Sequence, residues 1–135
     1  MTHRPHITTL FTMGLLSFLL GCSQSGSKLV EGGLYYTKKD NGSYSVMKIL
    51  KLDDGGVHVR LYSNQFSTPP ARVEESTLYM VGVDRKPNET LGMGHAPISK
   101  RSFAGWKAVF FQQSTVKDDE LEGYKMWLEA KGGYF

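Results

Sequence analysis

Two β-strand patterns joined by a short turn constrain the fold more than any other part of this sequence. Residues 43–52 and 57–63 flank the turn Asp53-Asp54-Gly55-Gly56, which is a strong hairpin signal. In the second run apolar and polar positions alternate, as expected of a strand with two different faces. The sequence therefore predicts an antiparallel hairpin at the centre of the domain.

The register of this hairpin follows from pairing Leu52 with Val57 across the turn. On the side predicted to face the core, this register pairs Leu50 with Val59 and Lys48 with Leu61. On the other side it pairs Lys51 with His58, Ile49 with Arg60, and Met47 with Tyr62. That second face is too apolar to be merely solvated. Either a helix covers part of it, or it presents an apolar centre with a cationic rim to a partner.

Three further strands are predicted around the hairpin, at residues 34–37, 78–83 and 108–113. The first is followed by an Asn-Gly turn at residues 39–42. Residues 84–97 lack any periodicity and contain two prolines and two glycines, so they are expected to form a loop.

Two helices are predicted in the last third of the chain. Ser99 can cap a short helix that reaches about Trp106, with Ile98 and Phe103 as its hydrophobic staple. A second helix begins at Thr115 or Asp118 and ends at Gly132-Gly133. Its predicted buried stripe consists of Leu121, Tyr124, Lys125 and Leu128. The order of elements predicts a small single α+β domain with a mainly antiparallel, strongly bent sheet. The opening strands could equally form a partial SH3-like barrel.

The first part of the chain has the features of a targeting segment rather than of a fold. Arg4 gives a weakly basic start, and residues 10–20 are almost wholly apolar. As a helix these residues reach only about half of the ~30 Å hydrocarbon core of a membrane. A basic start, a short apolar run and small residues afterwards are typical of a secretory signal.

The stretch Leu19-Leu20-Gly21-Cys22 resembles the lipobox of bacterial lipoproteins. The resemblance implies cleavage between Gly21 and Cys22, diacylglycerol on the Cys22 thiol and acylation of the new amino terminus. Ser23 would then favour delivery to the outer membrane, with the domain anchored at its inner leaflet and facing the periplasm. The alternative is an ordinary signal peptide in which Cys22 is incidental. The predicted organisation is a signal peptide at residues 1–21, a lipidated tether at 22–28 and one domain at 29–135.

Charge and cysteine content exclude several classes of function. Without residues 1–21, whose only charged side chain is Arg4, the chain has 15 basic and 13 acidic side chains, a balance of +2. No cationic stripe typical of nucleic-acid binding is present. The single cysteine excludes an internal disulfide. We therefore expect no nucleic-acid partner, and the membrane as one partner through Cys22.

The mature chain has few side chains suited to catalysis. Its histidines are His58, a polar position on a strand face, and His95, in a loop bracketed by glycines. His95 can be a proton shuttle, a recognition group, or a residue that fixes the loop by a backbone hydrogen bond. Metal sites need three or four well-spaced ligands, which the sequence lacks. The acidic cluster at residues 118–122 lacks the spacing of an EF-hand and suits a helix amino terminus. We expect neither a metal nor a cofactor.

These observations favour a non-catalytic, membrane-tethered envelope lipoprotein that binds a protein or an envelope polymer, with an immunity or inhibitor role as one version. Trp127 lies at the margin of the last helix's buried face, where it can anchor an interface or close the sheet edge. The candidate binding surface consists of Met47, Ile49, Arg60, Tyr62, His95 and Trp127. Two alternatives remain: a small envelope hydrolase or lyase that uses His95, and a structural accessory subunit of an envelope complex.

Overall fold

The computed structural model describes residues 28–135. The predicted signal peptide, the lipidation site Cys22 and nearly all of the predicted tether lie outside the described residues.

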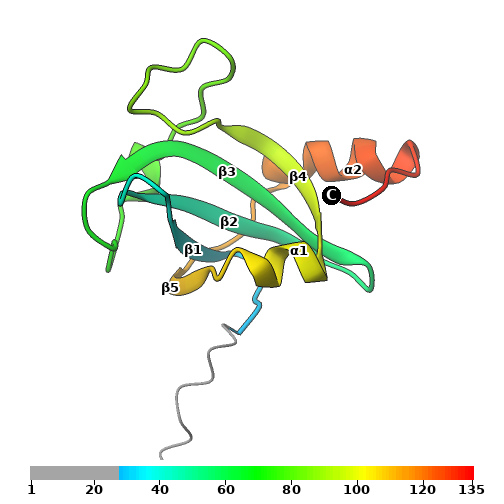
Figure 1. Cartoon of the computed structure of the whole chain (residues 1–135). Coiled ribbons are helices and arrows are strands. Elements are labelled where there is room, and N and C mark those ends of the chain that lie inside the picture. The colour runs from blue at the N-terminus through cyan, green and yellow to red at the C-terminus, as the bar shows by residue number, and fades with distance from the viewer. Residues whose placement is uncertain (1–27) are drawn as a thin grey trace, which may run out of the picture.

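The domain is built on one antiparallel sheet of five strands in the order β4-β3-β2-β1-β5. The strands are β1 (Gly33–Lys38), β2 (Tyr44–Leu52), β3 (Gly56–Phe66), β4 (Met93–Ser99) and β5 (Val109–Gln113). Helix α1 (Lys100–Gly105) and helix α2 (Glu122–Glu129) lie on opposite sides of this bent sheet (Figure 1). Two single 3-10 turns, η1 (Glu75–Thr77) and η2 (Asp118–Leu121), complete the described elements. The predicted α+β class with a short helix and a C-terminal helix is confirmed.

The β2–β3 hairpin starts in the predicted register and then departs from it. Leu52 pairs with Val57 and Lys51 with His58, as expected. A bulge then leaves Leu50 as an extra residue in β2, so that Ile49 pairs with Val59 rather than with Arg60. A shift of one residue moves every later side chain to the opposite face. The predicted faces of Lys48, Ile49 and Met47 are therefore wrong.

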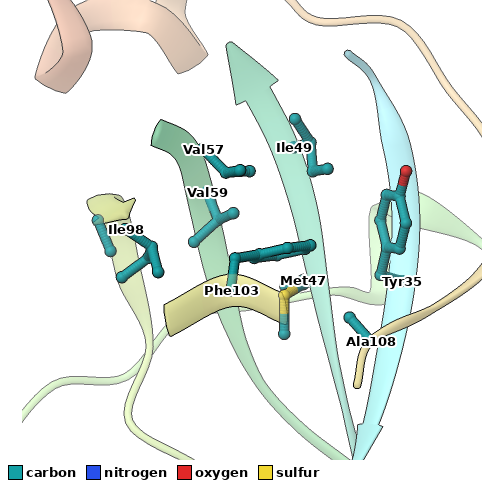
Figure 2. Packing of buried hydrophobic residues seen from close by; sticks show 9 residues of the cluster. Tyr35, Met47, Ile49, Val57, Val59, Ile98, Phe103 and Ala108 are labelled. Atoms are coloured by element: carbon teal, nitrogen blue, oxygen red, sulfur yellow. The ribbon is translucent and has the colours of Figure 1, made fainter. Parts of the chain in front are cut away.

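The first face of the sheet carries the main core, and α1 covers it. Phe103 of α1 packs over the strands (Figure 2). Its ring meets that of Tyr35 edge-on at 6.1 Å between centroids. The buried members of this cluster are Tyr35, Met47, Ile49, Val57, Val59, Ala96, Ile98, Phe103 and Ala108. The hydrophobic staple predicted for Ile98 and Phe103 is consistent with their burial in the same cluster.

Helix α1 begins where its sequence signal places it. The Ser99 hydroxyl accepts a hydrogen bond from the backbone N–H of Ser102 at 3.2 Å, and Trp106 is the C-cap. We predict that Ser99→Ala lowers the free energy of unfolding by about 1 kcal/mol, the usual loss for removing such a cap. Urea unfolding of the two proteins measures this difference. Ser102→Ala, which keeps the cap acceptor, is the control; an equal loss in both variants would contradict the role of the cap.

The second face is covered by two segments from the later part of the chain. Next to β3 and β4 it is covered by η2, α2 and the last residues of the chain (Figure 1). Farther along, η1 and its flanks contribute to a smaller cluster of Leu34, Val46, Tyr62 and Val73. The sequence left two alternatives open for the second face, coverage by a helix or exposure to a partner. The observed second face is partly covered by a helix, α2.

Two predicted elements differ from the observed ones. No strand forms at residues 78–83. Tyr79 O accepts a hydrogen bond from Ser63 N, but the N–H of Val81 goes to the side-chain oxygen of Ser63 and Val81 O accepts from Gly92 N, so no regular ladder with one strand is made. The strand beside β3 at this edge of the sheet is instead β4, most of which lies in the stretch 84–97 predicted to be a loop. The strand is hard to see in sequence because Gly94 and Pro97, two residues unfavourable in strands, interrupt the pattern, although Ala96, Pro97 and Ile98 are all buried.

Helix α2 is shorter than predicted, and it turns a different side to the sheet. Neither Thr115 nor Asp118 caps it; Glu120 accepts the backbone N–H of Lys117 at 2.9 Å, and a 3-10 turn precedes the helix. Leu128, predicted to be buried, is 49% exposed. The side that meets the sheet carries Tyr124 and Trp127.

Candidate functional site

A chain of three side chains runs through the second face of the sheet. His58 of β3 is completely buried, and its Nε2 lies 2.7 Å from Asp53 Oδ2. Its Nδ1 lies 2.8 Å from Nε2 of His95 in β4. We call Asp53, His58 and His95 the histidine relay. It brings together both histidines of the described chain, which are separated by 37 positions in sequence.

Asp53 is held in place by the turn that sequence analysis identified. Its Oδ1 accepts the backbone N–H groups of Gly55 and Gly56 at 3.0 and 2.8 Å. Its Oδ2 accepts the hydroxyl of Tyr134 at 2.5 Å. Burial alone would raise the pKa of Asp53, but hydrogen bonds from Tyr134, His58 and Gly56 outweigh it and lower this pKa to about 2. The carboxylate is therefore ionised throughout the neutral range.

Three aromatic rings from the C-terminal part of the chain enclose His58. The rings of Trp127, Tyr124 and Tyr134 have their centroids 4.5, 4.7 and 5.6 Å from that of the imidazole. Helix α2 can come this close because Gly123 has no side chain: a Cβ there would lie 2.6 Å from the Cβ of His95. The relay and its aromatic cage thus fasten the C-terminal segment to the sheet.

His95 and Asp53, the two ends of the relay, are both partly exposed, whereas His58 between them is buried. The Nε2 of His95 is occupied by His58, whereas its Nδ1 makes no hydrogen bond within residues 28–135. Burial, and then the neighbouring His58, lower the pKa of His95 below its ordinary value. His95 is therefore neutral at physiological pH, and the relay can pass a proton between its outer nitrogen and His58.

We predict that acid destabilises the domain partly through His95. Because its pKa is lowered by folding, the unfolded chain binds more protons below the ordinary histidine pKa, and stability falls as the pH drops through about 6.5. The groups facing it are His58, Tyr124 and Trp127, with Arg60 bonded to the nearby Gly94 O. The melting temperature is measured from about pH 8 to about pH 5.5. His95→Gln should show a smaller fall than the wild type; an identical profile would contradict the prediction.

Next to the relay, Lys48 forms a buried ion-pair network on the same face. Its side chain is fully buried, with Nζ 3.0 Å from Glu120 Oε1, 3.3 Å from Glu75 Oε2 and 2.7 Å from Thr115 O. Arg60 Nη1 lies 3.7 Å from the other oxygen of Glu120. These contacts join β2 and β3 to η1 and η2. Burial, and then the negative charge of Glu120, raise the pKa of the nearby Tyr62.

The six residues of the predicted binding surface do not share one exposed face. Met47 and Ile49 are buried under α1, whereas Tyr62 is buried on the second face. Arg60, His95 and Trp127 remain partly exposed on that second face. The prediction of a common surface is wrong because the bulge at Leu50 reverses the faces of β2. Of its members, His95 and Trp127 do lie together, with ring centroids 6.4 Å apart.

An open groove lies at the other end of the sheet, away from the histidine relay. It consists of two hollows of about 630 and 400 Å³ that share Lys39 and Thr90 as lining residues. Lys39 Nζ donates a hydrogen bond to Thr90 Oγ1 at 2.9 Å, which joins the β1–β2 turn to the segment that projects between β3 and β4 (Figure 1). The smaller hollow reaches Met47, Leu61 and Trp106. The larger one reaches Val83, Arg85, Lys86 and Leu91.

We call the two hollows together the cationic groove, because their combined lining includes Lys38, Lys39, Arg85 and Lys86. This site was not predicted from the sequence. Its signal is two adjacent basic pairs, each in or beside a turn, but nothing local shows that residues so far apart in sequence meet. Met47 and Tyr62 of the predicted surface contribute to its floor, although both are almost wholly covered.

Comparison with known proteins provides no further assignment. No protein-family model matches the chain, and no curated protein or solved structure proved similar to it. Within residues 28–135 no helix is both long enough and apolar enough to cross a membrane. In that same part of the chain, no three histidine, cysteine or acidic side chains are grouped as metal ligands would be.

Proposed function

We propose that this protein is a lipid-tethered, non-catalytic binding domain of the bacterial envelope, and that the cationic groove is its binding site. The observation that carries the proposal is the groove itself: two adjoining hollows on one small domain, each within the size range of ligand sites, about 300–1,000 Å³. Its partner is a protein or an envelope component, and an immunity or inhibitor role is one form that such binding can take.

The chemistry of the groove supports recognition rather than catalysis. No histidine or cysteine is among its described lining residues, which are mainly basic, amide, hydroxyl and apolar groups. The one lining carboxylate, Glu89, is already engaged: it accepts the backbone N–H of Lys86 at 2.8 Å and a hydrogen bond from Tyr79. The groove therefore offers charge and apolar surface, but no acid–base pair.

The binding role can be tested with two charge-reversed variants of the full-length protein, isolated from membranes in detergent. Arg85→Glu/Lys86→Glu reverses two cations of the groove. Lys125→Glu/Lys131→Glu reverses two exposed cations at α2 and just beyond it, with the same change in net charge. We expect a specific envelope component to co-purify with the wild type and the α2 variant but not with the groove variant. Equal recovery with both variants would show that the groove is not the binding site.

The lipid tether of the proposal rests on the resemblance of residues 19–22 to a lipobox. Two or three acyl chains hold a protein stably on a membrane, and such an anchor raises the effective concentration of the domain near an envelope partner. We predict that Cys22→Ala blocks processing and releases the protein from membranes. Cell fractionation and intact-mass measurement give the result. A variant that is still processed and membrane-bound would contradict the lipid anchor.

A small envelope hydrolase or lyase is the second candidate function, and the histidine relay favours it. Sequence analysis left His95 without an acid; the structure supplies Asp53, connected through His58. In this role His95 would be a general base with its Nδ1 towards solvent. Purified protein and His95→Ala are incubated with peptidoglycan, and released fragments are measured by mass spectrometry. Release by the wild type alone would support the enzyme; no release by either supports the binding domain.

A further inference from the structure

The two hollows of the cationic groove adjoin each other, because Lys39 and Thr90 line both of them. One end is marked by Trp106, at the end of α1, and the other by Arg85 and Lys86 in the segment between β3 and β4. A ligand that fills both hollows must therefore be elongated. It must also match the chemistry of both.

The cations of the groove form no close ion pairs, although the charge of Lys86 acts on nearby Glu89. Of Lys38, Lys39, Arg85 and Lys86, none forms a salt bridge with a carboxylate of residues 28–135. Glu89 is the one acidic lining residue described, and the hydrogen bond from Lys86 N, then that from Tyr79, lower its pKa. Glu89 is therefore ionised, but four cations line the groove against this one carboxylate, so the groove as a whole is positive. Potentials of one sign in a cleft favour a ligand of the opposite sign.

Apolar groups line the groove together with these cations. Val83 is 88% exposed, and Leu91 and Trp106 are each 37% exposed, although all three line the groove. Met47 and Leu61 provide the floor of the smaller hollow. Aliphatic side chains of a ligand can cover this surface, whereas a hydrophilic polyanion would leave it exposed.

We propose that the cationic groove binds an extended, acidic segment of a partner protein, in which carboxylates alternate with aliphatic side chains. The carboxylates meet the two basic pairs, and the aliphatic side chains cover Leu91, Val83 and the floor at Met47. This inference rests on the proposed binding function and names the chemistry of the partner. An anionic polysaccharide would meet the same cations but would make no use of the apolar lining.

The proposal is tested by calorimetric titration of the full-length protein in neutral detergent micelles. The probe is a capped peptide that repeats Glu-Leu-Glu-Gly. One matched peptide carries lysine in place of each glutamate, and another carries glycine in place of each leucine. Polygalacturonate represents an anionic polysaccharide. We expect the Glu-Leu peptide to bind, the lysine peptide not to bind, and the glycine peptide and the polysaccharide to bind at least about tenfold more weakly.

The charge-reversed variants locate the binding. Arg85→Glu/Lys86→Glu should weaken binding of the Glu-Leu peptide by about tenfold or more, since each reversal removes an attraction and adds a repulsion. Lys125→Glu/Lys131→Glu should leave the affinity for the Glu-Leu peptide unchanged. The melting temperature of each variant shows whether it is folded. For the wild type, binding should weaken as NaCl rises from about 50 to about 500 mM.

The outcomes separate this inference from the function on which it rests. Equal or tighter binding of the glycine peptide or the polysaccharide would overturn the acidic-segment proposal, as would equal effects of the two variants. If the Glu-Leu peptide does not bind, but co-purification of an envelope component still depends on Arg85 and Lys86, the ligand chemistry proposed here is wrong and the binding function stands. If co-purification is also independent of these residues, both fail.

Discussion

Replacing Glu120 with leucine is expected to lower the free energy of unfolding by about 3 kcal/mol, near the lower end of the losses seen when a buried ion pair loses one partner. The variant leaves the ammonium of Lys48 completely buried, with only Glu75 at 3.3 Å and the carbonyl of Thr115 at 2.7 Å to satisfy it. Those remaining contacts keep the loss from being larger. Urea unfolding followed by circular dichroism measures it.

Two further variants show whether the loss comes from the stranded charge. Lys48→Met/Glu120→Leu removes both charges, so it should be more stable than Glu120→Leu alone. Glu122→Leu removes an exposed carboxylate two positions later and should change stability by less than about 0.5 kcal/mol. A double variant less stable than Glu120→Leu would contradict the role assigned to Lys48.

Replacing His58 with alanine is also expected to lower the free energy of unfolding by about 3 kcal/mol, and to loosen the C-terminal segment in particular. The change opens a cavity under Trp127 and Tyr124 and removes a hydrogen bond from both Asp53 and His95. Hydrogen exchange should then be faster for the amides of α2 and less changed for those of α1, which packs on the other face.

His95→Ala is the matched control for this second variant. His95 is only partly buried, so its loss should cost about 1 kcal/mol and leave the Asp53–His58 contact in place. A loss in His95→Ala as large as that in His58→Ala would show that the outer histidine, rather than the buried one, holds the C-terminal segment. Uniform acceleration of exchange in both helices would contradict a local role for His58.

Local signals explain what could be predicted of the fold. Helix α1 is framed within a few residues by the cap at Ser99 and the staple of Ile98 and Phe103, so its position follows from the sequence. The turn at residues 53–56 likewise fixes the start of the hairpin. The bulge at Leu50 has no such local signal, because an apolar residue fits either face, and one inserted residue reverses all positions before it.

The candidate sites depend on contacts that the sequence does not encode locally. His58 and His95 could be singled out as rare ionisable groups, but their contact requires β4, which Gly94 and Pro97 conceal. Asp53 was recognisable only as a turn residue. The cationic groove depends on the meeting of two basic pairs from separate turns, and neither pair has a functional signal of its own.

The central claim is that the groove, rather than the face with the histidine relay, meets the partner in the envelope. Site-specific photo-crosslinking in living cells tests this most directly. A photoreactive amino acid is introduced into the full-length protein either at position 91 in the groove, or at position 126 on α2, where Met126 is 65% exposed. We expect a discrete cross-linked adduct from position 91 and none from position 126. An adduct from position 126 alone, or the same adduct from both positions, would contradict it.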